Sequence, residues 1–276
     1  MPSKGGGAPG WRSGIIAAGN GTGVSHRRNI AFGWVLALLV AASFARLGFW
    51  QLDLMHRKQA MLDAVHAVLQ DRIARPLAVA ADPRRSGGYD WSAGAGRFAA
   101  MPAILLDNQG RGDNAGVRAY RVFLPASGAP LLVELGWLPL PGDRRMPALP
   151  LPAGTTRVAG LLAPPPSAGI VDAPAVAQPD GTLLAIALDL PMLRTTLRLP
   201  ALAPRVLKLD PAQRLDGGPA YARDLDILPN TLPPQRHLGY AVQWFGLAIA
   251  VLATALVLTF RKPRKHAMRT SRTSTR

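Results

Sequence analysis

Two long apolar stretches near the ends of the chain constrain its fold more than any other feature. Residues 30–49 carry a single charge, Arg46, and residues 238–260 carry none. At about 1.5 Å per residue, a helix of either length crosses a hydrocarbon layer about 30 Å thick. The first stretch continues as apolar sequence without a small-x-small site followed by a break, so we interpret it as a retained anchor and not a cleaved signal peptide. The sequence therefore predicts two transmembrane helices.

The net charge of +16 is concentrated in the two tails. Residues 1–29 contain four Lys or Arg and residues 261–276 contain seven, and neither tail contains an acid. Basic clusters beside two membrane spans are the positive-inside signal, so we expect both termini in the cytoplasm and residues 50–237 on the opposite side. Attraction to anionic membrane lipid adds to this effect. The alternative, a tail that binds nucleic acid, accounts less well for clusters that directly flank the spans, and we expect no nucleic-acid partner.

The segment between the spans is expected to fold as one domain. The chain has no cysteine, which excludes thiol nucleophiles, thiolate metal sites and disulfides. Apolar positions over residues 51–75 mostly follow three-and-four spacing, which predicts a helix that Pro76 ends. Residues 1–29 are rich in Gly and Ser, so we expect a disordered tail, and residues 261–276 form a second basic tail.

From about residue 96 the pattern changes to short apolar runs interrupted by Gly, Pro and Asn. Such runs are typical of β-strands joined by turns, and one of them continues into a short helix. The predicted fold class is an α+β membrane protein, with two transmembrane helices flanking a β-rich extracytoplasmic domain. The runs lie at residues 97–110, 118–126, 129–141, 153–165, 183–197 and 203–212.

One face of the second span carries unusual side chains for an anchor. His237, Tyr240 and Trp244 are spaced at i, i+3 and i+7, and Arg46 and Trp50 of the first span reach a similar depth if the spans pack together. Imidazole can ligate iron, a guanidinium can pair with a carboxylate, and the rings can line a pocket, which suits a flat apolar macrocycle with carboxylate arms. The alternative is an interfacial aromatic belt beside a solvated histidine.

Motifs of common enzymes are missing from the sequence. It contains no nucleophile elbow, P-loop, zinc-protease motif or dinucleotide fingerprint. If the outer domain carries an unrecognised catalytic site, Asp107, Asn108 and Glu134 are the polar residues to consider among the β runs. The structural alternative is that Asp107 and Asn108 occupy a turn and that Glu134 faces water on an alternating strand.

Three segments, in this order, resemble the surfeit-locus family of cytochrome c oxidase assembly factors. They are LGFWQL at residues 47–52, the strand motifs between residues 104 and 139 (ILLDNQG, YRVFLP and LLVELGWLP), and LPPQRHLGYAVQWFGLA at residues 232–248. The resemblance extends over residues 30–262. The chain departs from the family where arginines are usual, with Leu54, Gln109 and Leu135 in their places, which makes it a divergent member and leaves any role of those arginines in doubt.

The resemblance implies an assembly factor, not an enzyme, that acts while haem a is placed in the catalytic subunit of a haem–copper oxidase. It implies transient binding of haem a, with His237 as the ligand of the haem iron. The catalytic subunit is the expected partner, and haem a synthase is a further one. The implied location is the bacterial inner membrane, with a multi-pass topology and a periplasmic main domain. A scaffold for oxidase subunits that binds no haem, and a membrane-anchored enzyme, remain as alternatives.

Overall fold

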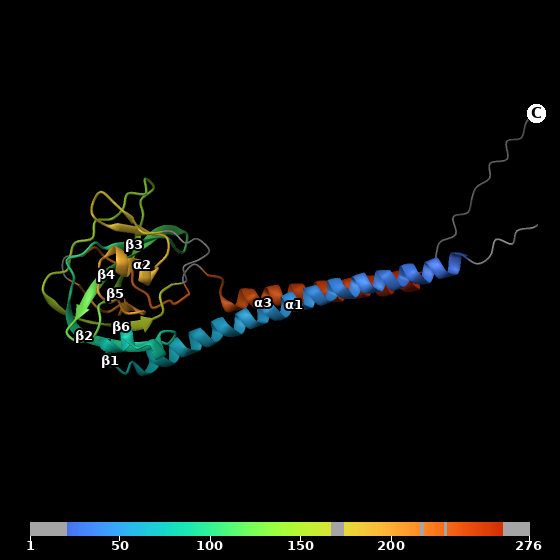
Figure 1. Ribbon diagram of the computed structural model, residues 1–276, viewed down its shortest axis with the longest axis horizontal. Coiled ribbons are helices and arrows are strands. Elements are labelled where there is room, and N and C mark those ends of the chain that lie inside the picture. The colour runs from blue at the N-terminus through green and yellow to red at the C-terminus, as the bar shows by residue number, and fades with distance from the viewer. Residues whose placement is uncertain (1–20, 167–173, 216–217, 229–230, 262–276) are drawn as a thin grey trace, which may run out of the picture. The chain divides into compact units, whose positions relative to one another are not determined.

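The computed structural model describes residues 21–166, 174–215, 218–228 and 231–261. The chain divides into two units (Figure 1). The helical unit combines Met1–Leu52 with Leu238–Arg276, and the sheet unit is Asp53–His237. Helix α1 (Gly21–Asp71) contributes to both units, and helix α3 (Pro234–Phe260) begins at the end of the sheet unit.

In the helical unit, α1 and α3 lie side by side and antiparallel (Figure 1). The Trp34 indole donates a hydrogen bond to Thr259 Oγ1 at 3.0 Å, and the ring of Phe49 lies 5.2 Å from that of Phe245. Gly48 makes room for the Phe245 ring, because a Cβ added at Gly48 would lie 2.7 Å from that ring. Further buried small residues along the contact are Ala41, Ala241 and Ala248.

The outward faces of both helices remain apolar and uncovered. Both helices are long and apolar enough to cross a membrane, and only 6% of the most apolar stretch of α1 and 11% of that of α3 is buried. Core helices of globular proteins have the opposite property, since their apolar residues are mostly covered. Two apolar helices therefore flank the sheet domain, as the sequence predicted.

The bounds of α1 correct two expectations. Residues 21–29 are helical and not disordered, while residues 1–20 and 262–276 lie outside the described residues. The helix runs without interruption from the apolar stretch into the sheet unit and ends at Asp71, before Pro76. Arg72 adopts a left-handed conformation with φ of +43° and donates its N–H to the Val68 carbonyl at 2.9 Å. This local C-terminal cap stops the helix before the proline can do so.

The sheet unit confirms the predicted α+β class. Its sheet has the strand order β1-β2-β6-β9-β5-β4-β3-β8-β7, and β2 also pairs with β4. The additional pairing closes β2, β6, β9, β5 and β4 into a barrel, which removes their free edges. The strands are β1 (Arg75–Pro76), β2 (Asp90–Phe98), β3 (Ile104–Arg111), β4 (Asn114–Pro125), β5 (Leu131–Pro139), β6 (Thr155–Ala163), β7 (Val176–Ala177), β8 (Leu183–Ala185) and β9 (Val206–Leu209).

The described part of the sheet unit also contains the short helices η1 (Leu77–Ala81), η2 (Pro83–Arg85) and α2 (Leu190–Thr196). The expected strand followed by a short helix corresponds to β8 and α2. Strand β2 was not predicted, because its sequence DWSAGAGRF lacks an apolar alternation.

Alternation along the barrel strands builds two hydrophobic clusters on opposite faces of the sheet. On β5, Leu131, Val133 and Leu135 belong to the interior cluster, together with residues of the other four barrel strands. Leu132 belongs to an outer cluster on which the buried leucines of α2 pack. Elsewhere on the outside, Val65 of α1 packs with the aromatic and aliphatic side chains of β2 and β6. The outer face of the barrel is therefore largely covered by other parts of the chain.

Candidate functional site

A row of directly paired residues crosses the covered outer face of the barrel. Tyr120 of β4 is opposite Glu134 of β5, which is opposite Lys208 of β9. Lys208 is in turn opposite Leu161 of β6, and Leu161 is opposite Trp91 of β2. Paired residues of neighbouring strands point to the same side of a sheet, so the pairing brings two charged side chains together between apolar neighbours.

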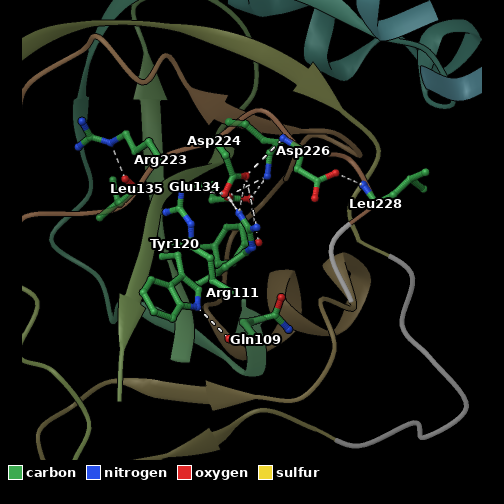
Figure 2. A network of polar contacts seen from close by, with 12 residues as sticks. Gln109, Arg111, Tyr120, Glu134, Leu135, Arg223, Asp224, Asp226 and Leu228 are labelled. Carbon is green, nitrogen blue, oxygen red and sulfur yellow. Dashed lines mark hydrogen bonds and ion pairs between the residues drawn. The ribbon is translucent and has the colours of Figure 1, made fainter. Parts of the chain in front are cut away.

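Glu134 is the centre of a buried ion cluster (Figure 2). Lys208 Nζ donates to both carboxylate oxygens at 2.8 Å, and Arg118 Nη1 donates to Oε1 at 2.5 Å. The Tyr120 hydroxyl donates to Oε2 at 3.1 Å. Arg118 also reaches Asp224 Oδ1, at 3.3 Å from Nη2. Glu134 is only 3% exposed, so the expectation that it faces water is wrong. Alternation predicted its side of the strand correctly, but other parts of the chain cover that side.

The cluster favours the charged forms of Glu134 and Arg118. Burial by itself would raise the pKa of Glu134, but Lys208 and Arg118 outweigh burial and lower it. Burial would likewise lower the pKa of Arg118, but Glu134 and Asp224 raise it. Burial, with the Glu134 charge, raises the pKa of Tyr120 well above its ordinary value, so its hydroxyl remains a donor. A carboxylate that accepts from three donors and has a lowered pKa is a poor general base near neutral pH.

A cavity of about 770 Å³ adjoins this cluster in the sheet unit. Asp107, Asn108 and Glu134, the three polar residues noted from the sequence, all line it together with Lys208. Its apolar lining comes from the ends of β3, β8 and β9 and from the segments that cover them, and includes Leu106, Ile186, Leu188, Val206, Ile227 and Leu228.

Asp107 and Asn108 do not occupy a turn between elements, as predicted, but an irregularity inside β3. The pairing with β4 shifts register between Leu106 and Gln109, and Asn108 has φ of +57°. An inserted residue of this kind re-aims side chains within a strand. Arg144 Nη2 donates to Asp107 Oδ1 at 2.9 Å and to Oδ2 at 2.8 Å.

A second buried ion cluster ties β2 to the segment before β9. Arg205 has a side chain with 0% exposure and donates to Asp90 Oδ2 at 2.7 Å. Arg85 and Arg75 also bind this carboxylate, each with Nε at 3.0 Å. Burial would raise the pKa of Asp90, but Arg85 and Arg205 lower it.

Sequence reasoning missed most members of both clusters. The available signal was a charged residue in the middle of an apolar strand, as with Arg118 and Lys208. A strand that is apolar throughout is expected to be buried on both faces, and a charge buried within it requires a partner. Of the positions where the family arginines are replaced, Leu135 is fully buried in the barrel. Gln109 is also buried, and its side-chain Nε2 donates to the Asp107 carbonyl at 3.0 Å. Leu54 is half-buried on α1.

The residues predicted to hold a cofactor are distributed over both units. Arg46, Trp50, Tyr240 and Trp244 belong to the helical unit. There Trp244 is half-buried, with its ring 5.6 Å from that of Phe44. Trp50 is 53% exposed, Tyr240 is 40% exposed, and Arg46 is also exposed. Three of the four predicted side chains are thus accessible to a partner.

His237 is the last residue of the sheet unit and is only 7% exposed. Nearby in the same unit, Lys58 Nζ donates to the Leu232 carbonyl at 2.6 Å and fastens the segment that precedes α3. Imidazole is a suitable donor for haem iron. The Nε2 atom of His237, however, is buried in this conformation. The arrangement around His237 therefore does not fit a bound haem without a rearrangement that exposes the imidazole.

Comparison with known proteins supplies the family. No curated protein matches the chain. A model of the SURF1 family matches residues 38–249, a range that includes the sheet unit and much of both long helices. The chain therefore belongs to the SURF1 family, which is associated with the assembly of cytochrome c oxidase.

Proposed function

We propose that the protein is a membrane-anchored assembly factor that docks on the catalytic subunit of a haem–copper oxidase and stabilises it while haem a is placed. The observation that carries the proposal is the family match across both helices and the sheet unit. Two helices whose apolar faces are uncovered support membrane insertion. The basic tails support a topology with both termini in the cytoplasm and the sheet unit in the periplasm of a bacterial cell.

The docking surface is the aromatic end of the helical unit, defined by Arg46, Phe49, Trp50 and Tyr240. Phe49 is 65% exposed, and the other three are also exposed. Aromatic and arginine side chains supply much of the energy of protein interfaces when a partner covers them. A membrane subunit that packs against the anchor would cover this surface and remain oriented by the sheet unit.

Transient binding of haem a at His237 is the second candidate. The ligand chemistry of imidazole and the family resemblance support it, whereas the burial of His237 favours docking without haem. Haem a synthase is a natural further partner if haem is handed over at this position. The haem-binding candidate requires that the imidazole becomes exposed on contact with a partner.

One experiment separates the two candidates. The full-length protein is expressed together with haem a synthesis and the oxidase catalytic subunit, purified in detergent, and examined for its absorption spectrum, extracted haem and co-purified subunit. His237→Ala is compared with His56→Ala, a histidine that lies exposed on α1. Docking without haem predicts co-purification of the subunit and no haem in any variant. Haem binding predicts a-type haem in wild type and His56→Ala, and its loss in His237→Ala.

A deletion strain tests the shared part of both candidates. Its membranes are expected to contain less a-type haem and less oxidase activity than those of the parent, and the intact gene should restore both. Normal haem content and normal activity in the deletion strain would contradict a role in oxidase assembly.

A further inference from the structure

A groove runs between α1 and α3 in the helical unit, away from the aromatic end. It has a volume of about 630 Å³, and its lining is apolar and small over most of its length. The residues that line it there are Ile30, Gly33, Leu36, Ala37 and Val40 of α1 and Leu247, Ala250, Val251, Ala255 and Leu258 of α3. Thr254 of α3 also lines it, and its hydroxyl donates to the Ala250 carbonyl of the same helix at 2.8 Å.

One end of this groove is polar. Asn29, Trp34 and Thr259 line it, and the Trp34 indole donates to Thr259 Oγ1 at 3.0 Å. Indole rings favour the boundary between acyl chains and headgroups. The groove therefore changes from apolar to polar where the helix pair is expected to leave the hydrocarbon layer.

Arginines lie just beyond the polar end on both helices. Arg27 precedes Ile30 by three residues and Trp34 by seven, which places it on the groove face of α1. Arg261 is the first residue after α3, and its N–H donates to the Val257 carbonyl at 3.0 Å, so the backbone still follows the helix three residues beyond Leu258 of the groove. Both arginines are exposed, as is the neighbouring Arg28.

The sequence offers these arginines no acidic partner within the helical unit. Residues 1–52 and 238–276, which make up that unit, contain no Asp or Glu. The basic end of the groove is thus an uncompensated positive charge beside an apolar channel. An occupant that matches both features combines an acyl chain with an anionic headgroup.

We propose that this groove binds one anionic phospholipid of the cytoplasmic leaflet. Its acyl chain lies along the apolar part, and its phosphate pairs with Arg27, Arg28 and Arg261. Basic pockets between transmembrane helices on the cytoplasmic side recognise anionic headgroups in this way, and arginine pairs with phosphate through charge-assisted hydrogen bonds. The inference rests on the proposed membrane insertion, but it does not depend on the role in oxidase assembly.

The first test measures headgroup preference. The full-length protein in detergent is mixed with equal amounts of phosphatidylglycerol and phosphatidylethanolamine, and retained lipid is counted by native mass spectrometry. We expect preferential retention of a single phosphatidylglycerol. Each of Arg27→Gln, Arg28→Gln and Arg261→Gln is expected to reduce that preference roughly five-fold, which corresponds to the usual contribution of one basic residue near an anionic surface.

The second test fills the groove. Gly33 lines it, and a Cβ added there meets nothing within 4 Å, so Gly33→Leu adds a side chain that starts in open space at the acyl channel. Gly246 of α3 is equally open but does not line the groove, which makes Gly246→Leu the matched control. We expect Gly33→Leu to lose the retained lipid and Gly246→Leu to keep it, with unchanged helix content by circular dichroism in both.

Three results would overturn the inference: equal retention of the two lipids, an unchanged preference in the triple arginine variant, or wild-type retention by Gly33→Leu. If Gly33→Leu instead loses the co-purified catalytic subunit and keeps its lipid preference, a partner helix occupies the groove. Release of the protein from membranes by alkaline carbonate would refute membrane insertion and both proposals with it. Loss of oxidase in the deletion strain with no lipid preference would refute the lipid site alone.

Discussion

Replacing Glu134 by Gln tests how much the buried ion cluster contributes to the stability of the barrel. The substitution preserves the shape of the side chain but removes the negative charge that faces Lys208 and Arg118. It also replaces one of the two acceptor oxygens by an NH2 group, which is a donor. Arg118 retains Asp224, whereas Lys208 has no other carboxylate among its described partners.

The expected magnitude follows from the burial of the pair. Lys208 and Glu134 have side chains only 7% and 3% exposed. Removing one partner of a buried ion pair strands a charge and costs about 3–5 kcal/mol. For a domain of this size each kcal/mol lowers Tm by about 2–4 °C, so Glu134→Gln should lower it by about 6–20 °C.

Thermal unfolding of the full chain in detergent, followed by near-ultraviolet circular dichroism at pH 7, measures this effect. Asp53→Asn is the matched control, because Asp53 binds Arg57 at 2.7 Å with both side chains more than half exposed. Exposed pairs contribute about 0–1 kcal/mol, so this variant should unfold within a few degrees of wild type. The double variant Glu134→Gln with Lys208→Met should be more stable than Glu134→Gln alone, because no charge is left stranded. A cost below about 1 kcal/mol for Glu134→Gln, or a double variant less stable than the single one, would refute the reasoning.

Three further predictions concern the sheet unit. The pKa values of Glu134 and Asp90 are lowered from 4.5 and 3.8, so their stabilisation is complete above those values and is lost as pH falls through the lowered folded-state values. Tm should therefore be level from pH 7 to about 5 and fall below about pH 4, and the fall should be less steep in Glu134→Gln. An identical fall in that variant would contradict the contribution of Glu134 to acid sensitivity. Arg205→Met should cost about 3 kcal/mol in thermal unfolding, because it removes the one fully buried cation bound to Asp90, and wild-type stability would count against this role. Gly160→Ala should lower the free energy of unfolding by at least about 1–3 kcal/mol, because its Cβ would collide with a backbone carbonyl of the facing strand β9. Gly87→Ala is the control and should leave Tm nearly unchanged, because a Cβ added there meets nothing within 4 Å.

Elements with a strong local pattern were predictable from the sequence. Long apolar stretches identified α1 and α3, and β3, β4, β5, β6 and β9 each contain the short apolar run that predicted them. Strand β2 was not predictable, because a run of Gly, Ala and Ser has no alternation, and its place depends on pairing with β6 and β4. The end of α1 was misjudged because the left-handed conformation of Arg72 leaves no mark in composition.

The candidate sites show the same division. The residues His237, Tyr240 and Trp244 could be singled out because polar and aromatic groups are unusual in an apolar helix. Charges inside apolar strands could have marked Arg118 and Lys208 one by one, but their meeting at Glu134 could not be predicted, because the members lie on three strands that the barrel register brings side by side. Sequence separations of 14 residues to Tyr120 and 74 to Lys208 are invisible to any local pattern.

Two apolar helices, basic tails without acids and a β-rich segment between them follow from the amino-acid sequence, because helix length, charge distribution and strand alternation are local properties. The folded structure was needed to learn that the sheet closes into a barrel and that Glu134 is buried with Lys208. It was also needed to learn that His237 is buried and that a groove lies between α1 and α3. These features depend on which distant segments pack together, and burial, ion pairing and cavities exist only after that packing has formed.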